Sequence, residues 1–384
     1  MYNVIIFTDI TDNIATMPSL GPFKCARVLR KNGYSCLVVN HLSKYLYDEL
    51  VELIDLTVDK DTFLVGFSTT FLKNTQVEII PGEPTPHYLP LGMETVFPQG
   101  KEFENKVIAY IKEKNNQVKF IAGGAKTSAQ YYNKNIDYAC IGYSEVSIVQ
   151  LANHLTKNTL LPNSFKNLLG ITIIDDRLAK GYDFANEDLV WEKTDVVNHK
   201  ALPLEVARGC IFKCRFCNFP MVGKKTLDYV KRPDILQKEL EYNYENYGIT
   251  NYVLGDDTFN DHPEKINLLH AMVKKLKFQP VFGGYHRLDL ICTRPESIEQ
   301  LYEIGVRFMY FGIESLNITA AKAIGKAHDR KKQIKMIEHL RSKYKDLSLH
   351  GSFIIGLPGE DIDSCRKTLG YLFCLLYTSD AADE

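Results

Sequence analysis

The sequence predicts an α/β protein with two domains, each built on a parallel sheet. Two patterns indicate this fold class: short apolar runs rich in β-branched residues, and amphipathic stretches that alternate with those runs. The chain has 384 residues, which is enough for two or three domains. Its 46 basic and 47 acidic residues leave a net charge of −1, so no overall field favours nucleic acid or a membrane surface as a partner.

The first domain is expected over residues 1–160. Five short apolar runs in this stretch have the composition of buried parallel strands. They span residues 4–7, 36–39, 63–67, 120–122 and 138–141. Amphipathic segments such as 23–31 and 101–114 alternate with them, which is typical of an open α/β sheet. Residues 72–100 carry Pro and Gly without a period and indicate an inserted loop, and residues 161–203 indicate a β-rich connector.

The helix signals in the second half of the chain are clear. Pro233 stands in the first turn of one predicted helix, and Gly248 follows its end. Thr293 and Glu296 have the spacing of a capping box that opens a further helix, which Gly305 ends. These signals predict a second series of helices that alternate with strands.

Five strands are expected between these helices. They span residues 204–208, 251–255, 280–285, 306–312 and 349–355. Five β/α units in series predict a partial or complete β/α barrel over residues 204–373. Residues 374–384 resemble the translated read-through of a sequencing adapter, so we expect the natural chain to continue differently after Phe373.

The cysteines of this chain are expected to be reduced. The apolar run before Thr8 and Asp9 has only four residues, and nowhere does the sequence reach the roughly 18 consecutive apolar residues of a membrane helix. We therefore expect a cytoplasmic protein. In that compartment the nine cysteines indicate free thiols or metal ligands and not disulfides.

Three of the nine cysteines are tightly clustered. Cys210, Cys214 and Cys217 have the spacing C-x₃-C-x₂-C just after a predicted strand. Thiolates are the ligands of iron–sulfur clusters and of zinc, so this loop predicts a metal centre. Lys213 and Arg215 within the loop would favour the thiolate forms.

The number of ligands separates two kinds of metal centre. A zinc site normally needs four protein ligands, and the nearest candidates for a fourth, His199 and Cys292, do not have the spacing of a zinc knuckle. Three ligands on one loop suit a cubane cluster with one iron left open, where a substrate binds. A purely structural iron–sulfur or zinc site is the alternative.

The C-x₃-C-x-Φ-C pattern, with aromatic Phe216 before the last cysteine, resembles the signature of the radical S-adenosylmethionine (SAM) superfamily. The resemblance covers about residues 200–373. It implies a [4Fe–4S] cluster on Cys210, Cys214 and Cys217, whose fourth iron chelates the amino and carboxylate groups of SAM. A one-electron reductant of the flavodoxin or ferredoxin type would then trigger cleavage of SAM to a 5′-deoxyadenosyl radical.

Further motifs at the ends of later predicted strands resemble that family's cofactor-binding segments. The resemblance places the amino end of SAM near the motif after the second strand, its ribose or carboxylate near the motif after the fourth, and its adenine near a glycine-rich segment after the fifth. The residues concerned are Phe216, Gly255, Asp256, Asp257, Arg287, Glu314, Ser315, Gly356 and Leu357. Polar groups at the carboxyl ends of successive strands are where β/α barrels form their active sites.

Residues 1–160 resemble the Rossmann-like, cobalamin-binding-type domain of one radical SAM subgroup. Gly123-Gly124 after one predicted strand and Ser68-Thr69 after another carry this resemblance. No D-x-H-x-x-G motif follows the first strand, so a histidine below the cobalt is not expected. Cobalamin bound without that ligand and a domain that has lost the cofactor both stay open.

The resemblance implies a radical SAM enzyme that transfers a methyl group, with methylthiolation or rearrangement as alternatives within the class. A non-catalytic iron–sulfur or zinc protein is the alternative outside it. SAM and a reductant are the expected partners, and neither a membrane nor a nucleic acid is expected. No motif in the sequence specifies the substrate.

Overall fold

The computed structural model describes residues 2–9, 17–42, 45–68, 101–124, 127–128, 133–178, 180–196, 200–217, 223–326 and 329–376. The chain divides into two compact units. Unit 1 comprises Met1–Tyr182 and Leu189–His199, and unit 2 comprises Asp183–Asp188 and Lys200–Glu384. The inserted loop expected at 72–100 and the residues after 376 lie outside the described residues.

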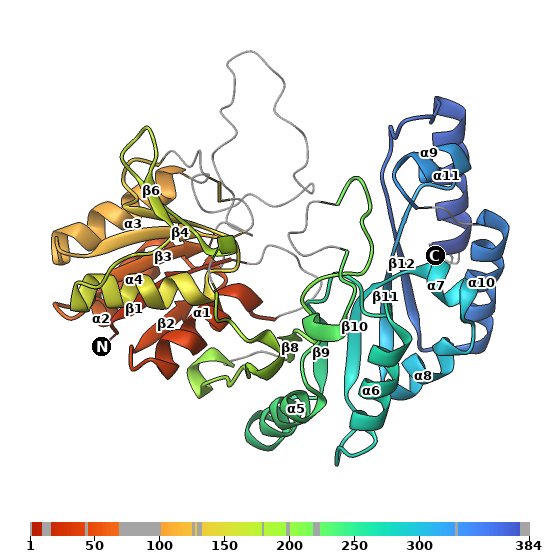
Figure 1. Ribbon diagram of the computed structural model, residues 1–384, viewed down its shortest axis with the longest axis horizontal. Helices are drawn as coiled ribbons and strands as arrows, with labels where there is room; N and C mark the ends of the chain where they lie inside the picture. Colours follow the sequence, from red (N-terminus) through yellow and green to blue (C-terminus); the bar gives the residue numbers. More distant parts are fainter. Residues whose placement is uncertain are drawn as a thin grey trace. The chain divides into compact units, whose positions relative to one another are not determined.

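Unit 1 is built on a seven-stranded sheet with the order β2-β1-β3-β4-β5-β7-β6 (Figure 1). The strands are β1 (Val4–Phe7), β2 (Cys36–Val39), β3 (Leu64–Ser68), β4 (Lys119–Gly123), β5 (Tyr138–Ile141), β6 (Ser164–Lys166) and β7 (Thr172–Asp175). All neighbours are parallel except β6, which is antiparallel to β7. The predicted open parallel sheet is confirmed, and the segment expected as a connector adds two strands to it.

Four helices accompany this sheet, α1 (Leu20–Lys31), α2 (Tyr47–Thr57), α3 (Lys101–Lys114) and α4 (Glu145–Lys157). Alternate strand residues such as Ile5 and Phe7 pack with α2 and α3 in one buried cluster. Val4 and Ile6, which point to the other face, are buried as well. The sheet is therefore covered on both faces, which explains why its strands are continuously apolar.

Residues 189–196 are attached to α1 of unit 1. The ring of Trp191 lies 4.8 Å from that of Phe23. The guanidinium of Arg30 donates to both carboxylate oxygens of the buried Asp195, at 2.6 and 3.0 Å. A bidentate pair of this kind fixes both distance and orientation. These contacts hold this segment against α1.

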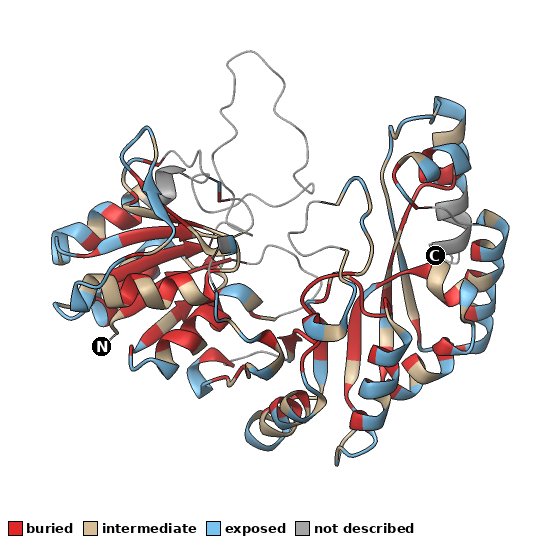
Figure 2. Ribbon diagram, in the orientation of Figure 1, coloured by how far each residue is buried: buried red, intermediate tan, exposed pale blue. Residues whose placement is uncertain are grey.

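Unit 2 is built on a five-stranded parallel sheet whose order, β8-β9-β10-β11-β12, follows the sequence. The strands are β8 (Ala201–Leu204), β9 (Asn251–Leu254), β10 (Val281–His286), β11 (Val306–Glu314) and β12 (Ser348–Phe353). The helices are α5 (Pro233–Tyr247), α6 (Pro263–Val273), α7 (Leu288–Thr293), α8 (Ser297–Ile304), α9 (Ile318–Ala323), α10 (Arg330–Lys343) and α11 (Ile362–Leu376). Buried residues concentrate in β8 to β11 and on the helix faces toward them, whereas β12 has none (Figure 2). The predicted barrel-type succession of β/α units is confirmed.

The first barrel strand differs from the prediction because the chain changes its partner early. It ends at Leu204 and does not reach residue 208. Beyond it, the backbone pairs with the segment before α5: Arg208 N–H donates to Tyr229 O and Lys231 N–H donates to Val206 O, both at 2.8 Å. The apolar pattern at residues 204–208 reflects buried side chains, although the strand itself ends at Leu204.

The capping box predicted from Thr293 and Glu296 is wrong. Thr293 is the last residue of α7, and its hydroxyl donates to the carbonyl of Asp289. Helix α8 begins at Ser297, and Glu296 at its N-cap makes no side-chain cap. Thr293 belongs to α7, a short helix that the sequence did not predict, and therefore does not cap α8.

Among the described residues, no helix is long and apolar enough to cross a bilayer.

Two helix-ending glycines differ in what surrounds them, which gives a matched pair of variants. Gly248 has φ +67° and open space where a Cβ would stand, whereas Gly305 has φ +110° and its Cβ would lie 2.0 Å from the carbonyl oxygen of Pro280. We expect Gly248→Ala to cost about 1 kcal/mol of unfolding free energy, from backbone strain alone. Gly305→Ala should cost about 3 kcal/mol or more, because a backbone atom must also move.

Chemical denaturation of both variants beside the wild type measures these costs. Equal destabilisation by the two substitutions would contradict the packing described at Gly305.

Candidate active site

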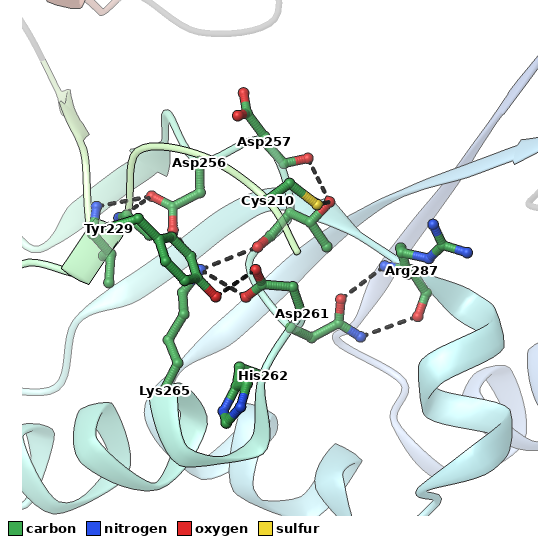
Figure 3. Close-up of polar contacts among 12 residues, drawn as sticks. Cys210, Tyr229, Asp256, Asp257, Asp261, His262, Lys265 and Arg287 are labelled. Atoms are coloured by element: carbon green, nitrogen blue, oxygen red, sulfur yellow. Dashed lines mark hydrogen bonds and ion pairs between the residues drawn. The ribbon is translucent and has the colours of Figure 1, made fainter. Parts of the chain in front are cut away.

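A buried ion pair anchors the start of the cysteine loop. Asp256, just after β9, accepts hydrogen bonds through Oδ1 from the backbone N–H groups of Val206 (2.8 Å) and Ala207 (3.0 Å). Its Oδ2 lies 2.8 Å from Nζ of Lys265 in α6, and both side chains are completely buried. Figure 3 shows Lys265 reaching up from its helix to this carboxylate. The pair thereby ties α6 and the end of β9 to the chain that leads into the cysteines.

Lys265 also holds the turn that follows Asp256. Its Nζ donates to the carbonyl of Thr258 at 3.0 Å and lies 3.4 Å from Asp261, whose other oxygen accepts from the hydroxyl of Tyr229 at 2.7 Å. Burial alone would lower the pKa of Lys265, but Asp256 and Asp261 raise it above its ordinary value. Sequence reasoning missed this lysine, although the i,i+4 spacing of Asp261 and Lys265 was a signal.

The three thiols lie in different surroundings. Cys210 is buried, with its Sγ 3.6 Å from the hydroxyl of Thr258, whereas Cys214 and Cys217 are half-buried. Burial raises the pKa of the Cys210 thiol. The N–H of Cys217 donates to the carbonyl of Cys214 at 3.1 Å, which closes a tight turn between them. A positively charged metal centre would offset the cost of ionising the buried thiol.

Arg287, directly after β10, reaches the middle cysteine. Its Nη1 lies 3.5 Å from Sγ of Cys214, and its guanidinium carbon lies 3.8 Å from the ring centroid of Phe212. The other edge of the guanidinium donates to both carboxylate oxygens of Asp289, at 3.0 and 2.5 Å. The cation against a cysteine of this loop therefore comes from another strand.

The two basic residues inside the loop have other contacts. Arg215 donates from its backbone N–H to Ile324 O at 3.0 Å and from Nη1 to Ala323 O at 2.9 Å. Lys213 lies across Gly223, where a Cβ would be 1.9 Å from the lysine Cε. The first pair attaches the cysteine loop to the end of α9. At Gly223, a side chain would displace Lys213, and the φ of +72° there also favours glycine.

Phe216 and Glu314 meet through a lysine. Nζ of Lys326 lies 5.7 Å from the ring centroid of Phe216 and 2.9 Å from Oε1 of Glu314. Lys326 also donates to the carbonyl of Gly312. Glu314 has φ +63°, a strained conformation for a residue with a side chain, and such strain is frequent at functional sites.

The segment after β12 is held to the end of β11. Ser315 Oγ hydrogen-bonds Glu360, whose Oε2 accepts from the backbone N–H groups of Gly356 (3.0 Å) and Leu357 (3.1 Å). The N–H of Ile354 donates to the carbonyl of Glu314 at 2.8 Å, which continues the pairing of the two strands. Glu360 thus shapes the glycine-rich turn that the sequence singled out.

Asp257 differs from its neighbour Asp256. Figure 3 shows its carboxylate directed away from the Asp256–Lys265 pair. It is half-buried, and within the described residues its buried Oδ2 has no hydrogen-bond partner. Burial, together with the charges of Asp256 and Glu205, raises the pKa of Asp257 to about 6. An acceptor in this state is suited to a cationic ligand. Gly255 precedes the two aspartates, and its N–H donates to Leu204 O at 2.8 Å.

The donor set fits a four-iron cluster. Cys210, Cys214 and Cys217 lie on one loop and supply three thiols, and in a cubane cluster each thiolate binds its own iron. Across the part of the chain that the structure describes, no three His, Cys, Asp or Glu side chains converge on one metal position.

The predicted site residues all lie at the carboxyl ends of consecutive strands of unit 2. The contacts above join the ends of β9 and β10 and the segment after β11 to the cysteine loop, and they join the end of β12 to that of β11. The supporting residues that sequence reasoning did not find are Phe212, Tyr229, Thr258, Asp261, Lys265 and Lys326. Most of them act through contacts between segments far apart in the chain.

The family comparison agrees with this geometry. Residues 204–372 match the model of the radical SAM superfamily. This part of the chain is a radical SAM domain. It begins at the last residue of β8 and includes every residue of the site described above.

A curated relative extends the likeness. The chain is 26% identical over 228 residues to bacteriochlorophyllide d C-8(2)-methyltransferase of Chlorobaculum tepidum, covering 56% of this chain and 47% of the relative. It therefore spans about half the length of that protein.

Two solved structures share the fold over nearly the whole chain. One is OxsB, a cobalamin-dependent SAM radical enzyme with aqua-cobalamin and SAM bound: TM-score 0.70, 15% identity, 97% of this chain and 52% of the other. The other is the methyltransferase TsrM of Kitasatospora setae, with tryptophan and a SAM analogue bound: TM-score 0.71, 13% identity, 97% of this chain and 71% of the other. At such low identity these likenesses show the fold alone.

The raised pKa of Asp257 predicts a pH-dependent stability in the ligand-free protein. Folding favours the protonated form of Asp257. Its contribution to the free energy of unfolding is therefore complete below the ordinary pKa of 3.8 and is lost as the pH rises through about 6. Near pH 8, Asp257→Asn should raise the unfolding free energy by about 1–2 kcal/mol, after discounting for partial exposure.

Near pH 4 the same substitution should have almost no effect, since the wild-type acid is then largely protonated. Thermal melts of both proteins across this range test the assignment. A stabilisation of equal size at both pH values would contradict it.

Proposed function

We propose that the chain is a radical SAM enzyme that transfers a methyl group. The observation that carries the proposal is the single loop with three thiols, around which the ends of four further strands are arranged. A [4Fe–4S] cluster held on this loop would supply the one electron that cleaves SAM at its S–C5′ bond into methionine and a 5′-deoxyadenosyl radical. The protein's share is to bind, orient and shield these groups.

The cluster would be held by Cys210, Cys214 and Cys217. These cysteines leave one iron of a four-iron cluster without a protein ligand, and SAM would chelate it through its amino and carboxylate groups. The chelate needs a nearby acceptor for the remaining hydrogens of the amino group. We assign this role to Asp257, because its carboxylate has an oxygen without a partner among the described residues. Asp256 is committed to Lys265 and to two backbone N–H groups, so we assign it the positioning of the loop.

The remaining predicted residues would line the rest of the SAM site. Glu314 ends β11 and Ser315 follows it. The turn at Gly356 and Leu357 follows β12, where exposed backbone suits a flat adenine ring. Gly356 has φ +85°, which a side chain would disfavour. Lys326 lies beside Phe216 of the cysteine loop and forms an ion pair with Glu314.

Methyl transfer is favoured over methylthiolation by the chemistry of the other thiols. Methylthiolation needs a sulfur donor in addition to SAM. In unit 1, Cys25, Cys36 and Cys140 are buried, and burial raises the pKa of each thiol, to about 12 for the last two. Buried neutral thiols are poor ligands for a second cluster. The relatives of the chain include methyltransferases and methylthiotransferases alike, so the choice rests on these thiols.

Cobalamin is the methyl carrier that we propose for unit 1. The strand order β2-β1-β3-β4-β5 is that of flavodoxin-like folds, which bind ligands where the order reverses, between β1 and β3. Buried polar groups lie at this edge: Thr8 hydrogen-bonds Ser19 at 2.9 Å, and Ser19 donates to Asn40 at 3.2 Å. Ser68 ends β3 there and is buried. Such groups fit a polar cofactor. The sequence lacks the D-x-H-x-x-G motif that would supply a histidine to its cobalt after β1.

Two variants separate the cluster from the SAM site. After anaerobic reconstitution, Cys214→Ala should lose the cluster absorbance and the formation of 5′-deoxyadenosine with dithionite, while unit 1 stays folded by circular dichroism. Asp257→Asn should keep the cluster but bind SAM about 10- to 100-fold more weakly, because one charge-assisted hydrogen bond is lost. A colourless zinc-loaded wild type, or a cluster retained by Cys214→Ala, would contradict the proposal.

Spectral titration of the purified chain with hydroxocobalamin tests unit 1. We expect one equivalent to bind with a spectrum that lacks a histidine ligand to cobalt. Binding should weaken about tenfold or more when Ser68→Leu places a bulky apolar group at the edge of β3, since a leucine there would also displace polar contacts. Binding that is absent from the wild type, or unchanged in the variant, would refute this placement.

A further inference from the structure

Arg287 is held by contacts of its guanidinium edge, its guanidinium face and its backbone. Two of its edge nitrogens are engaged by Asp289, its face lies on Phe212, and its backbone N–H and C=O both pair with the side chain of Asn260, at 2.8 and 3.0 Å. The residue is only 6% exposed. These contacts leave Nη1 as the free corner of the fork, and Nη1 lies 3.5 Å from Sγ of Cys214.

This arrangement leaves little of the cation for a ligand. A guanidinium that clamps a carboxylate offers two parallel N–H groups, and here Asp289 already takes that pair. The sulfur of Cys214 takes the remaining side. The contact spans 73 residues of sequence, so it belongs to the tertiary fold and not to the local loop.

The other two cysteines differ from Cys214. Cys210 faces the hydroxyl of Thr258, whose proton is already donated to the carbonyl of Asp257 at 2.7 Å. Within the described residues, no charged side chain hydrogen-bonds the sulfur of Cys210 or Cys217, and the loop's own Arg215 donates to a carbonyl. The buried guanidinium therefore contacts one sulfur of the three.

We propose that Arg287 is a positioning residue that acts on the cluster through the Cys214 thiolate, and not a ligand for the carboxylate of SAM. A buried cation that donates to a ligand sulfur stabilises the cluster more when it carries the extra electron than when it does not. Hydrogen bonds to the sulfurs are among the factors that set cluster potentials. Arg287 thus raises the reduction potential and makes the one-electron reduction easier. The inference rests on the proposed function, because it requires the cluster.

Redox titration of the reconstituted chain without SAM, followed by electron paramagnetic resonance, tests this role. In Arg287→Gln we expect the ratio of reduced to oxidised cluster at a fixed potential to fall about tenfold, which for one electron is about 59 mV. The affinity for SAM, measured by equilibrium dialysis, should change by less than about threefold, which is a small change in binding free energy. A clamp on the SAM carboxylate would give the reverse: an unchanged potential without SAM and strongly weakened binding.

Arg215→Gln is the matched control. It removes the same charge from the residue next to Cys214, but its guanidinium contacts only a backbone carbonyl and the residue is exposed. Among the described residues that carbonyl is the one hydrogen-bond partner of the guanidinium, so we expect little change in potential. If the control shifts the potential as far as Arg287→Gln does, a general charge effect replaces our inference.

Iron and sulfide assays accompany each measurement. If Arg287→Gln does not load a full cluster, Arg287→Lys keeps the charge without the planar fork and should load iron with a smaller shift in the same direction. An unchanged potential in a fully loaded Gln variant, or in the Lys variant where Gln fails, overturns the inference alone. A wild type that holds no cluster overturns the proposed function with it.

Discussion

The site depends on one buried ion pair, between Lys265 and Asp256. Neither side chain touches solvent. Removing one partner from such a pair leaves an uncompensated buried charge and costs about 3–5 kcal/mol. The pair also satisfies two backbone N–H groups at the start of the cysteine loop. A single interaction therefore joins helix α6, the end of β9 and the metal-binding segment, so the loop cannot move independently of the sheet.

Around this anchor the site combines groups of different electrostatic character. Asp256 is neutralised by its lysine, Asp257 is destabilised by burial, and Arg287 is held against a thiol. Burying these groups costs folding free energy. Asp257 places a carboxylate where a cationic ligand would need it, and Arg287 places a cation where a metal-bound thiolate would need it. A site that is strained without its ligands and relieved with them is the expected signature of preorganisation.

Much of this was visible in the sequence, because the decisive signals are local. The spacing of the three cysteines, the prolines at the starts of α5 and α6, and the glycines after α5 and α8 each determine their structure within one turn of chain. Strand positions followed from apolar runs, with errors of a few residues where burial continued past the last paired residue, as after Leu204.

The remainder was hidden because it depends on contacts between distant segments. The spacing of Asp261 and Lys265 indicated a pair, but lysines are mostly exposed, so the sequence did not show that Lys265 is completely buried. The cation beside Cys214 was sought in the loop itself, at Lys213 and Arg215, whereas it comes from the end of another strand. The two adjacent aspartates looked equivalent in sequence. Only the structure shows that Asp256 forms an ion pair with a buried lysine, whereas Asp257 forms none among the described residues.

The central claim is that three thiolates leave one metal corner open for SAM. Mössbauer spectroscopy of the chain reconstituted with ⁵⁷Fe, recorded before and after addition of SAM, tests it most directly. The account predicts four irons of which a single one changes its isomer shift when SAM is added, while the other three keep theirs. Four irons that ignore SAM, or a protein that takes up zinc and no iron, would contradict it.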